Sequence, residues 1–246
     1  MYNYIQNLAD NTLILGQRLA QWCGHGPFLE EDLALTNTSL DILGQAQMLL
    51  NLAAEIKDDG STADDLAFLR DAIAFKNVIL VEQPNGDFAQ TMLRQYFMDV
   101  YHVHLYERLS NSSNQRLAEI AEKSLKEVTY HLERSQLWMQ RLAHGTKESF
   151  ERLQKALNEL WHYTHELFEE SAELDDLVEQ GVAADPVYLK IHWEADVKEW
   201  LASTALTIPN TGWRATGGIN GHHSEYLGLM LCEMQFLQRA YPDCEW

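Results

Sequence analysis

Basic residues are scarce in this chain: 18 lysines and arginines stand against 37 aspartates and glutamates, which gives a formal net charge of −19. Nucleic acids and anionic membrane surfaces are bound through basic faces, because their phosphates must be neutralised. A chain with this charge balance is poorly suited to either. We therefore predict partners that include neither nucleic acid nor a membrane.

Cysteines and long apolar runs are also rare. The three cysteines, at positions 23, 232 and 244, form neither a CxxC metal pattern nor a disulfide framework, which is typical of a reducing compartment. No apolar stretch is long enough to span a bilayer, and the first residues lack the basic region and apolar run of a signal peptide. These absences predict a soluble, cytoplasmic protein.

Proline and glycine are few, with 5 and 13 among 246 residues, so most of the chain is free to be helical. The spacing of the apolar residues predicts helices, and no segment shows the sustained period of two that is typical of a strand. The predicted helices cover residues 8–22, 30–56, 63–80, 87–109, 115–143, 147–178, 185–200 and 222–241. Residues 209–221, with four glycines, form the longest predicted loop.

Long helices joined by short loops indicate an all-α protein built as a helical bundle with accessory helices. No repeat and no break in composition marks a boundary, so we predict one domain over residues 1–246. Within it, residues 30–56 carry apolar side chains around the whole circumference, which is typical of a helix buried on every side. Ser61 or Thr62 is expected to cap the helix that follows.

Asp99 and His102 form the pair that points most directly to chemistry, because residues three apart share one helical turn. In ferritin-like bundles this spacing, usually written Glu-x-x-His, binds half of a di-metal centre, which needs a second such pair and two further carboxylates. Asp99 is predicted on the apolar face, with His102 on its shoulder and Gln95 and Tyr106 on the same line. A buried carboxylate must be metal-bound, paired or hydrogen-bonded, so a metal site and a polar network both remain open.

Three further residues are candidates for the same centre. Asp41 is predicted to be buried in the apolar helix 30–56, flanked by an amide side chain one turn away on either side. Glu127 and His131 are four residues apart, and Tyr130 stands where the ferritin-like spacing would place the histidine. His131 is predicted to face inward and Glu127 to lie at the edge of that face. Each of these residues could equally belong to a buried hydrogen-bonded network.

Glu159-Leu-Trp-His162 is a literal ExxH string, but its position argues against a buried site. The apolar stripe of its predicted helix lies on the opposite side. We therefore predict that Glu159, His162 and Glu166 form a solvated face. His165 and Glu169 lie at the margin of that face and could at most bind a surface metal.

The remaining motifs give weaker evidence for a functional site. His222 and His223 are adjacent and point about 100° apart, so they cannot address one centre; we predict a helix N-terminal turn under the glycine-rich loop. Cys23 lies near His25 but lacks the orienting partner of an activated nucleophile. The chain contains no glycine-rich nucleotide loop and no nucleophile elbow. The residues alone thus leave one incomplete set of metal ligands.

Five segments carry a family resemblance that extends over essentially the full length. They are LGQRLAQWCGHGPFLEEDLAL (15–35), SLDILGQAQ (39–47), LVEQPNGDFAQTMLRQYF (80–97), TGGINGHHSEYLGLML (216–231) and EMQFLQRAYP (233–242). In these segments the chain resembles the C subunits of the multicomponent phenylacetyl-CoA epoxidases, the ring 1,2-phenylacetyl-CoA monooxygenases.

The resemblance implies a ferritin-like four-helix bundle core with additional helices. It also implies a heteromer with the catalytic A-type chain of the epoxidase, which holds the di-iron centre, while FAD and an iron–sulfur cluster belong to a reductase component. The C-type chains keep the fold without the ligand set. We therefore expect no catalytic, cofactor-binding or metal residue in this chain, and a vestigial buried polar cluster of Asp41, Asp99, His102, Glu127 and His131.

Three hypotheses follow. The first is a non-catalytic structural subunit of an oxygenase that epoxidises the ring of phenylacetyl-CoA in aerobic phenylacetate degradation. The second is an active metal-carboxylate oxygenase with an unorthodox site on the same five residues. The third is a stand-alone helical binding protein, for which seven tryptophans and ten tyrosines would supply interface anchors.

Overall fold

The computed structural model describes residues 1–210, 212–242 and 244, and these residues fold into helices without a β-strand. They form two compact units, Met1–Pro84 with Thr216–Trp246 and Asn85–Ala215. The all-α class is as predicted and is consistent with a ferritin-like fold. The expectation of one domain over residues 1–246 stays a prediction. In the described part of the chain, no helix is long and apolar enough to cross a membrane.

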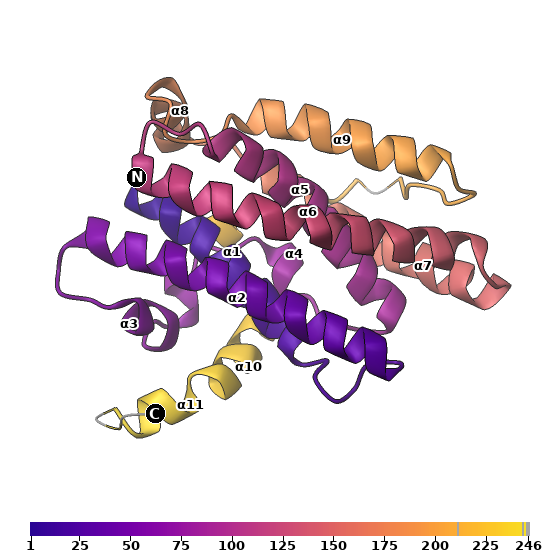
Figure 1. Cartoon of the computed structure of the whole chain (residues 1–246), viewed down its shortest axis with the longest axis horizontal. Helices are drawn as coiled ribbons and strands as arrows, with labels where there is room; N and C mark the ends of the chain where they lie inside the picture. The colour runs from indigo at the N-terminus through magenta and orange to yellow at the C-terminus, as the bar shows by residue number, and fades with distance from the viewer. Residues whose placement is uncertain (211, 243, 245–246) are drawn as a thin grey trace. The chain divides into compact units, whose positions relative to one another are not determined.

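The first unit is built on two long helices that pack along each other, as Figure 1 shows. They are α1 (Tyr2–Ala20), which begins six residues before the predicted helix 8–22, and α2 (Leu29–Lys57), which is close to the predicted helix 30–56. The unit also contains α3 (Ala63–Phe68), the 3₁₀ turn η1 (Ala72–Ala74), α4 (Ile79–Glu82), η3 (Gly218–Asn220), α10 (Glu225–Met234) and α11 (Phe236–Ala240).

The prediction of one helix over residues 63–80 is wrong. Thr62 does cap α3 through a reciprocal pair of bonds with Asp65, but that helix ends at Phe68. Beyond it, side chains of α1 take the hydrogen-bonding groups that a helix would use internally. Gln6 Nε2 donates to the Ala74 carbonyl at 2.8 Å, and Asn7 Nδ2 donates to the Lys76 carbonyl at 2.6 Å. These two bonds satisfy the carbonyls of the non-helical chain in place of intrahelical bonds.

The prediction of one helix over residues 222–241 is also wrong at its start. Gly217 and Gly221 have positive φ angles of +106° and +83°, which turn the chain tightly. A Cβ on Gly221 would lie 2.4 Å from the Ile73 carbonyl oxygen, so only glycine fits. The chain then passes through His223 and Ser224 in a non-helical conformation, and α10 starts at Glu225.

The second unit is built on the antiparallel neighbours α5 (Phe88–Leu109) and α6 (Gln115–His144), which pack side by side in Figure 1. Both match the predicted helices 87–109 and 115–143. Their starts are capped, because Asp87 accepts from the Gln90 amide and Asn114 from the Leu117 amide, each at 3.0 Å. The other helices are α7 (Lys147–Leu160), η2 (Trp161–Phe168), α8 (Ala172–Glu179) and α9 (Pro186–Ala202).

The prediction of one helix over residues 147–178 is wrong, because the chain tightens into the 3₁₀ helix η2 after Leu160. Trp161 opens this segment by packing on Phe97 of α5 and Trp193 of α9, with ring centroids 5.9 Å away in both cases. The Trp193 indole also donates to the Phe97 carbonyl at 2.9 Å. Aromatic packing against two other helices thus overrides the local preference for an α-helix.

Candidate functional site

Asp99 and His102 are both buried within α5, as predicted for Asp99. One oxygen of the Asp99 carboxylate accepts a hydrogen bond from Gln95 Nε2 at 2.6 Å, one turn earlier on the same helix. The His102 ring stacks on Tyr106, with centroids 5.7 Å apart and an interplanar angle of 25°. The predicted polar–aromatic line therefore exists, and its contacts within α5 are a hydrogen bond and a ring stack.

From α6, His131 is the candidate that faces inward. Its side chain is buried, whereas Tyr130 is largely exposed and Glu127 is half-buried. The register of α6 thus places Tyr130 toward solvent and His131 inward, as predicted for His131. The charge of His131 acts to lower the pKa of Asp99, and α5 and α6 pack along each other.

Burial governs the protonation of Asp99 and His102. Loss of solvent raises the pKa of Asp99 from 3.8 to about 6, and nearby groups only partly oppose that rise. The opposing side chains are His131, Ser135, Gln95 and Arg134. The same loss of solvent, with a smaller contribution from His131, lowers the pKa of His102 from 6.5 to about 3, so the His102 ring is neutral at pH 7.

Replacing Asp99 by asparagine is expected to stabilise the chain above pH 6. A carboxyl with a folded pKa of about 6 and an ordinary value of 3.8 contributes stability that is complete below about pH 4 and is lost as pH rises through 6. The shift corresponds to about 3 kcal/mol at 1.36 kcal/mol per pH unit. Urea unfolding from pH 4 to 8 measures it, since the advantage of Asp99→Asn should disappear toward pH 4. An advantage that is equal at every pH would contradict the shifted carboxyl.

The burial predicted for Asp41 is wrong. Asp41 also belongs to a different unit from the other candidate residues. Its side chain is half-buried, although Gln45 one turn later is fully buried and Asn37 one turn earlier is exposed. Asp41 lies on α2 of the first unit, whereas the α5 and α6 candidates lie in the second. Asp41 is only half-buried because α2 packs against its own unit on one side and is exposed on the other. Apolar neighbours in the sequence therefore do not ensure that a residue is buried.

The ExxH string lies at the end of α7, where Glu159 is exposed as predicted. His162 is half-buried, and its ring lies 4.5 Å from that of Trp213 between centroids. The prediction that Glu166 is solvated is wrong, because Glu166 is buried. The 3₁₀ geometry of η2 advances each residue by about 120° rather than 100° and so turns Glu166 inward. His165 and Glu169 are half-buried at the margin.

The α5–α6 residues do not fit a di-iron centre. Such a centre draws four carboxylates and two histidines from facing helices, whereas here one buried carboxylate accompanies two buried imidazoles. Within either unit, across residues 1–210, 212–242 and 244, no three His, Cys, Asp or Glu side chains gather closely enough to hold a metal ion. What these side chains can do chemically is hold protons in fixed places between two helices.

Sequence reasoning missed a buried polar network around Glu82. One carboxylate oxygen accepts from His223 Nδ1 at 2.5 Å and Asn77 Nδ2 at 2.9 Å. The other accepts from the Ser224 amide at 2.8 Å and the Ser224 hydroxyl at 2.6 Å. His223 Nε2 also lies 3.0 Å from the Phe75 carbonyl. Because both ring nitrogens face acceptors, the ring satisfies both only as an imidazolium.

A second missed pair ties α1 to the segment after α3. The buried Asp10 carboxylate accepts from Arg70 through both of its oxygens, one of them at 2.9 Å, and from the Lys76 amide at 2.9 Å. The guanidinium also lies 4.1 Å above the Phe75 ring. The available signal was a single acid inside the apolar helix 8–22, but its partner 60 residues away has no sequence signature.

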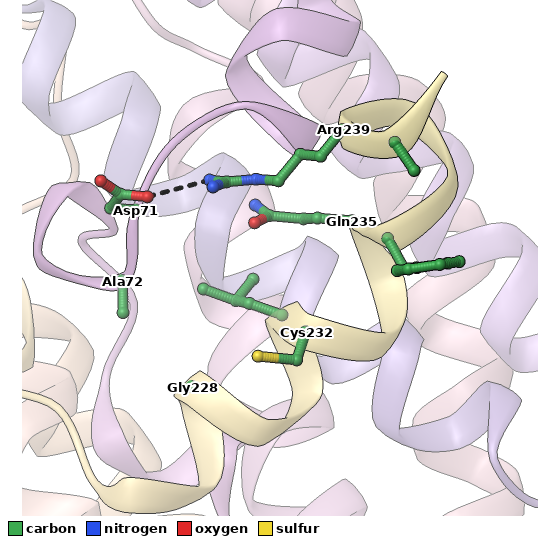
Figure 2. A pocket seen from close by; sticks show the side chains of 9 residues that line it. Asp71, Ala72, Gly228, Cys232, Gln235 and Arg239 are labelled. Carbon is green, nitrogen blue, oxygen red and sulfur yellow. Dashed lines mark hydrogen bonds and ion pairs between the residues drawn. The ribbon is translucent and has the colours of Figure 1, made fainter. Parts of the chain in front are cut away.

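A cavity of about 630 Å³ lies between α10–α11 and the turn after α3, and Figure 2 shows its lining. Its polar side chains are used within the chain. Gln235 Nε2 donates to the Ala67 and Arg70 carbonyls, and Arg239 bonds the Asp71 carboxylate at 3.0 Å, as the dashed line in Figure 2 marks. These bonds join α11 and the residue before it to the turn. The surface that remains free in the cavity is mainly apolar.

Comparison with known proteins gives two matches. The model of a family described as phenylacetic acid catabolic protein matches residues 1–246. The chain is also 49% identical to the C subunit of 1,2-phenylacetyl-CoA epoxidase from Escherichia coli (strain K12), over 244 residues that cover 99% of this chain and 98% of that protein. These matches agree with the resemblance carried by the five sequence segments. The chain belongs to the phenylacetic acid catabolic protein family.

Proposed function

We propose that this chain is the non-catalytic structural subunit of a multicomponent oxygenase that epoxidises the ring of phenylacetyl-CoA in aerobic phenylacetate degradation. The observation that carries the proposal is the 49% identity, over nearly the full length of both chains, to a protein named as the C subunit of such an epoxidase. We place its action in the cytoplasm. Its partner is the metal-bearing, catalytic A-type chain, and FAD and the iron–sulfur cluster belong to a reductase component.

The α5–α6 cluster supports a structural role over catalysis. Asp99, His102 and His131 are buried between two packed helices, and Asp99 is already hydrogen-bonded within the chain. Such a cluster can fix the register of α5 against α6, as buried polar groups do in some helical proteins. The alternative, an oxygenase site on Asp41, Asp99, His102, Glu127 and His131, is disfavoured by the half-burial of Asp41 and Glu127.

Co-expression with the metal-bearing epoxidase subunit of the same organism tests the proposal. The two chains should purify together through a tag on either one, and the complex should contain the iron of one di-iron centre for each pair of chains. The chain purified alone should contain less than stoichiometric iron. Two irons per isolated chain with an oxygen-dependent optical band would contradict the proposal. A well-behaved single chain that never co-purifies would instead favour a stand-alone binding protein.

A further inference from the structure

Helix α2 exposes a line of leucines, which contradicts the expectation that this helix is buried on every side. Leu29, Leu33 and Leu40 are 70%, 55% and 62% exposed. At 100° per residue they lie within about 40° of one another on the helix. We call these three residues the leucine face. Single exposed leucines are common, but three on one line of one helix form a continuous apolar strip.

The leucine face lies opposite the side of α2 that packs inside its own unit. The buried residues Leu35, Ile42 and Leu49 are fully inaccessible, and they point about 180° away from the leucine face. An ordinary surface helix is apolar toward the core and polar toward water. Helix α2 is apolar in both directions, which is the pattern of a helix placed between two layers.

The start of the leucine face is held rigidly by the preceding turn. The Gly26 amide donates to Asp32 Oδ2 at 2.8 Å, which closes the turn onto the first helical turn of α2. Backbone hydrogen bonds from Gly26, Gly24 and His25 hold the pKa of Asp32 below its usual value, so the carboxylate stays charged and bonded. A surface that is ordered in advance loses less conformational entropy when a partner binds.

The charges around the leucine face determine what kind of partner fits. Helix α2 contains five acids and a single base at its last residue, and residues 19–56 contain no lysine or arginine. Four of these acids, Glu30, Asp32, Asp41 and Glu55, lie within about 100° of the leucine face at 100° per residue, and Glu31 points away from it. A second copy of this chain would bring the same acids against one another, which like-charge repulsion opposes. A partner whose apolar centre is bordered by lysine and arginine is complementary.

We propose that the leucine face of α2 is the docking surface for the metal-bearing epoxidase subunit, through a helix that is apolar at its centre and basic at its rim. The inference rests on the proposed function and names the surface that the heteromer uses. The apolar centre supplies affinity, while the acidic border selects the basic partner and excludes self-association.

The double variant Leu33→Asp/Leu40→Asp tests the surface in the full-length chain. Affinity for the co-expressed metal-bearing subunit should fall at least about tenfold, because apolar anchors at the centre of an interface carry most of its binding energy. Both positions are exposed, so the isolated chain should melt as the wild type does. If the double aspartate variant does not fold, Leu33→Ala/Leu40→Ala should still weaken binding several-fold. Ile191→Asp on α9, at a residue 60% exposed, is the matched control and should bind normally.

Charge reversal at Glu30 tests the identity of the occupant. Glu30→Lys should weaken binding of the metal-bearing subunit several-fold in about 0.1 M NaCl, and less so in about 0.5 M NaCl, where charges are screened. If wild-type and double-aspartate chains bind equally, the leucine face is not the docking surface while the proposed function stands. If Ile191→Asp weakens binding as much, the assignment to α2 is overturned. A wild-type homodimer that the aspartates dissociate would identify a second copy as the occupant, and failure of the wild type to bind would overturn both proposals.

Discussion

Replacing Glu82 by leucine is expected to lower the free energy of unfolding by about 3–5 kcal/mol, the usual cost of removing one partner from a buried charged network. Glu82 is fully buried and accepts hydrogen bonds from His223, Asn77 and Ser224. Leucine fills the space but leaves the imidazolium and three further donors without their acceptor. For a chain of this size the loss corresponds to a fall in melting temperature on the order of 10 °C.

The matched control is Asp71→Leu, because Asp71 is an acid of the same unit that pairs with Arg239 at 3.0 Å but is exposed to solvent. Exposed ion pairs contribute little, so this variant should melt close to the wild type. Calorimetry or circular dichroism at pH 7 measures both variants. If Glu82→Leu melts with the wild type, the carboxylate network does not stabilise the fold.

Replacing Asp10 by alanine is expected to cost a similar amount, about 3–5 kcal/mol, since it leaves the Arg70 guanidinium, whose side chain is only 11% exposed, without its ion-pair partner. It also removes the acceptor of the Lys76 amide, which holds the extended segment before α4. Hydrogen exchange should therefore show faster exchange at Lys76 than in the wild type. The double variant Asp10→Ala/Arg70→Met should recover much of the lost stability, because it removes the unpaired charge. A double variant no more stable than Asp10→Ala would contradict the explanation.

The long helices were predictable because their periodicity and caps are local. Helices α2, α5, α6 and α9 begin within two residues of their predicted starts, and Asp87 and Asp185 cap as such residues do at helix N-termini. The breaks in helices 63–80, 147–178 and 222–241 were not predictable in this way. The first two are made by side chains distant in sequence, such as Asn7, which binds the Lys76 carbonyl, and the third by Gly221, which lies against the distant Ile73 carbonyl. No local propensity reports such contacts.

In the candidate site, too, the features that depend on local periodicity were predictable and those that depend on distant contacts were not. The inward positions of Asp99 and His131 followed from helical periodicity, because each lies on the apolar side of an amphipathic helix. The burial of Asp41 failed because periodicity shows that a face is apolar without showing what covers it. The Glu82–His223 network depends on a loop that returns 141 residues later, and periodicity contains no information on such a pairing.

The leucine face and the α5–α6 cluster give α2, α5 and α6 distinct roles in the proposed complex. A helix that is apolar on both sides provides docking, while a buried polar cluster fixes the register of two other helices. Neither role requires a bound metal in this chain. In the proposed complex the partner subunit carries out the reaction, and this chain binds the partner and keeps its own helices in register.

The most direct test of the non-catalytic role is the epoxidation rate of the complex assembled with Asp99→Asn. The substitution removes the one fully buried carboxylate of the α5–α6 cluster and nearly preserves its shape. The structural account predicts that the variant complex converts phenylacetyl-CoA at close to the wild-type rate, with unchanged iron per complex. A loss of activity together with loss of iron, in a variant that still folds and still binds its partner, would contradict the account and identify Asp99 as a metal ligand.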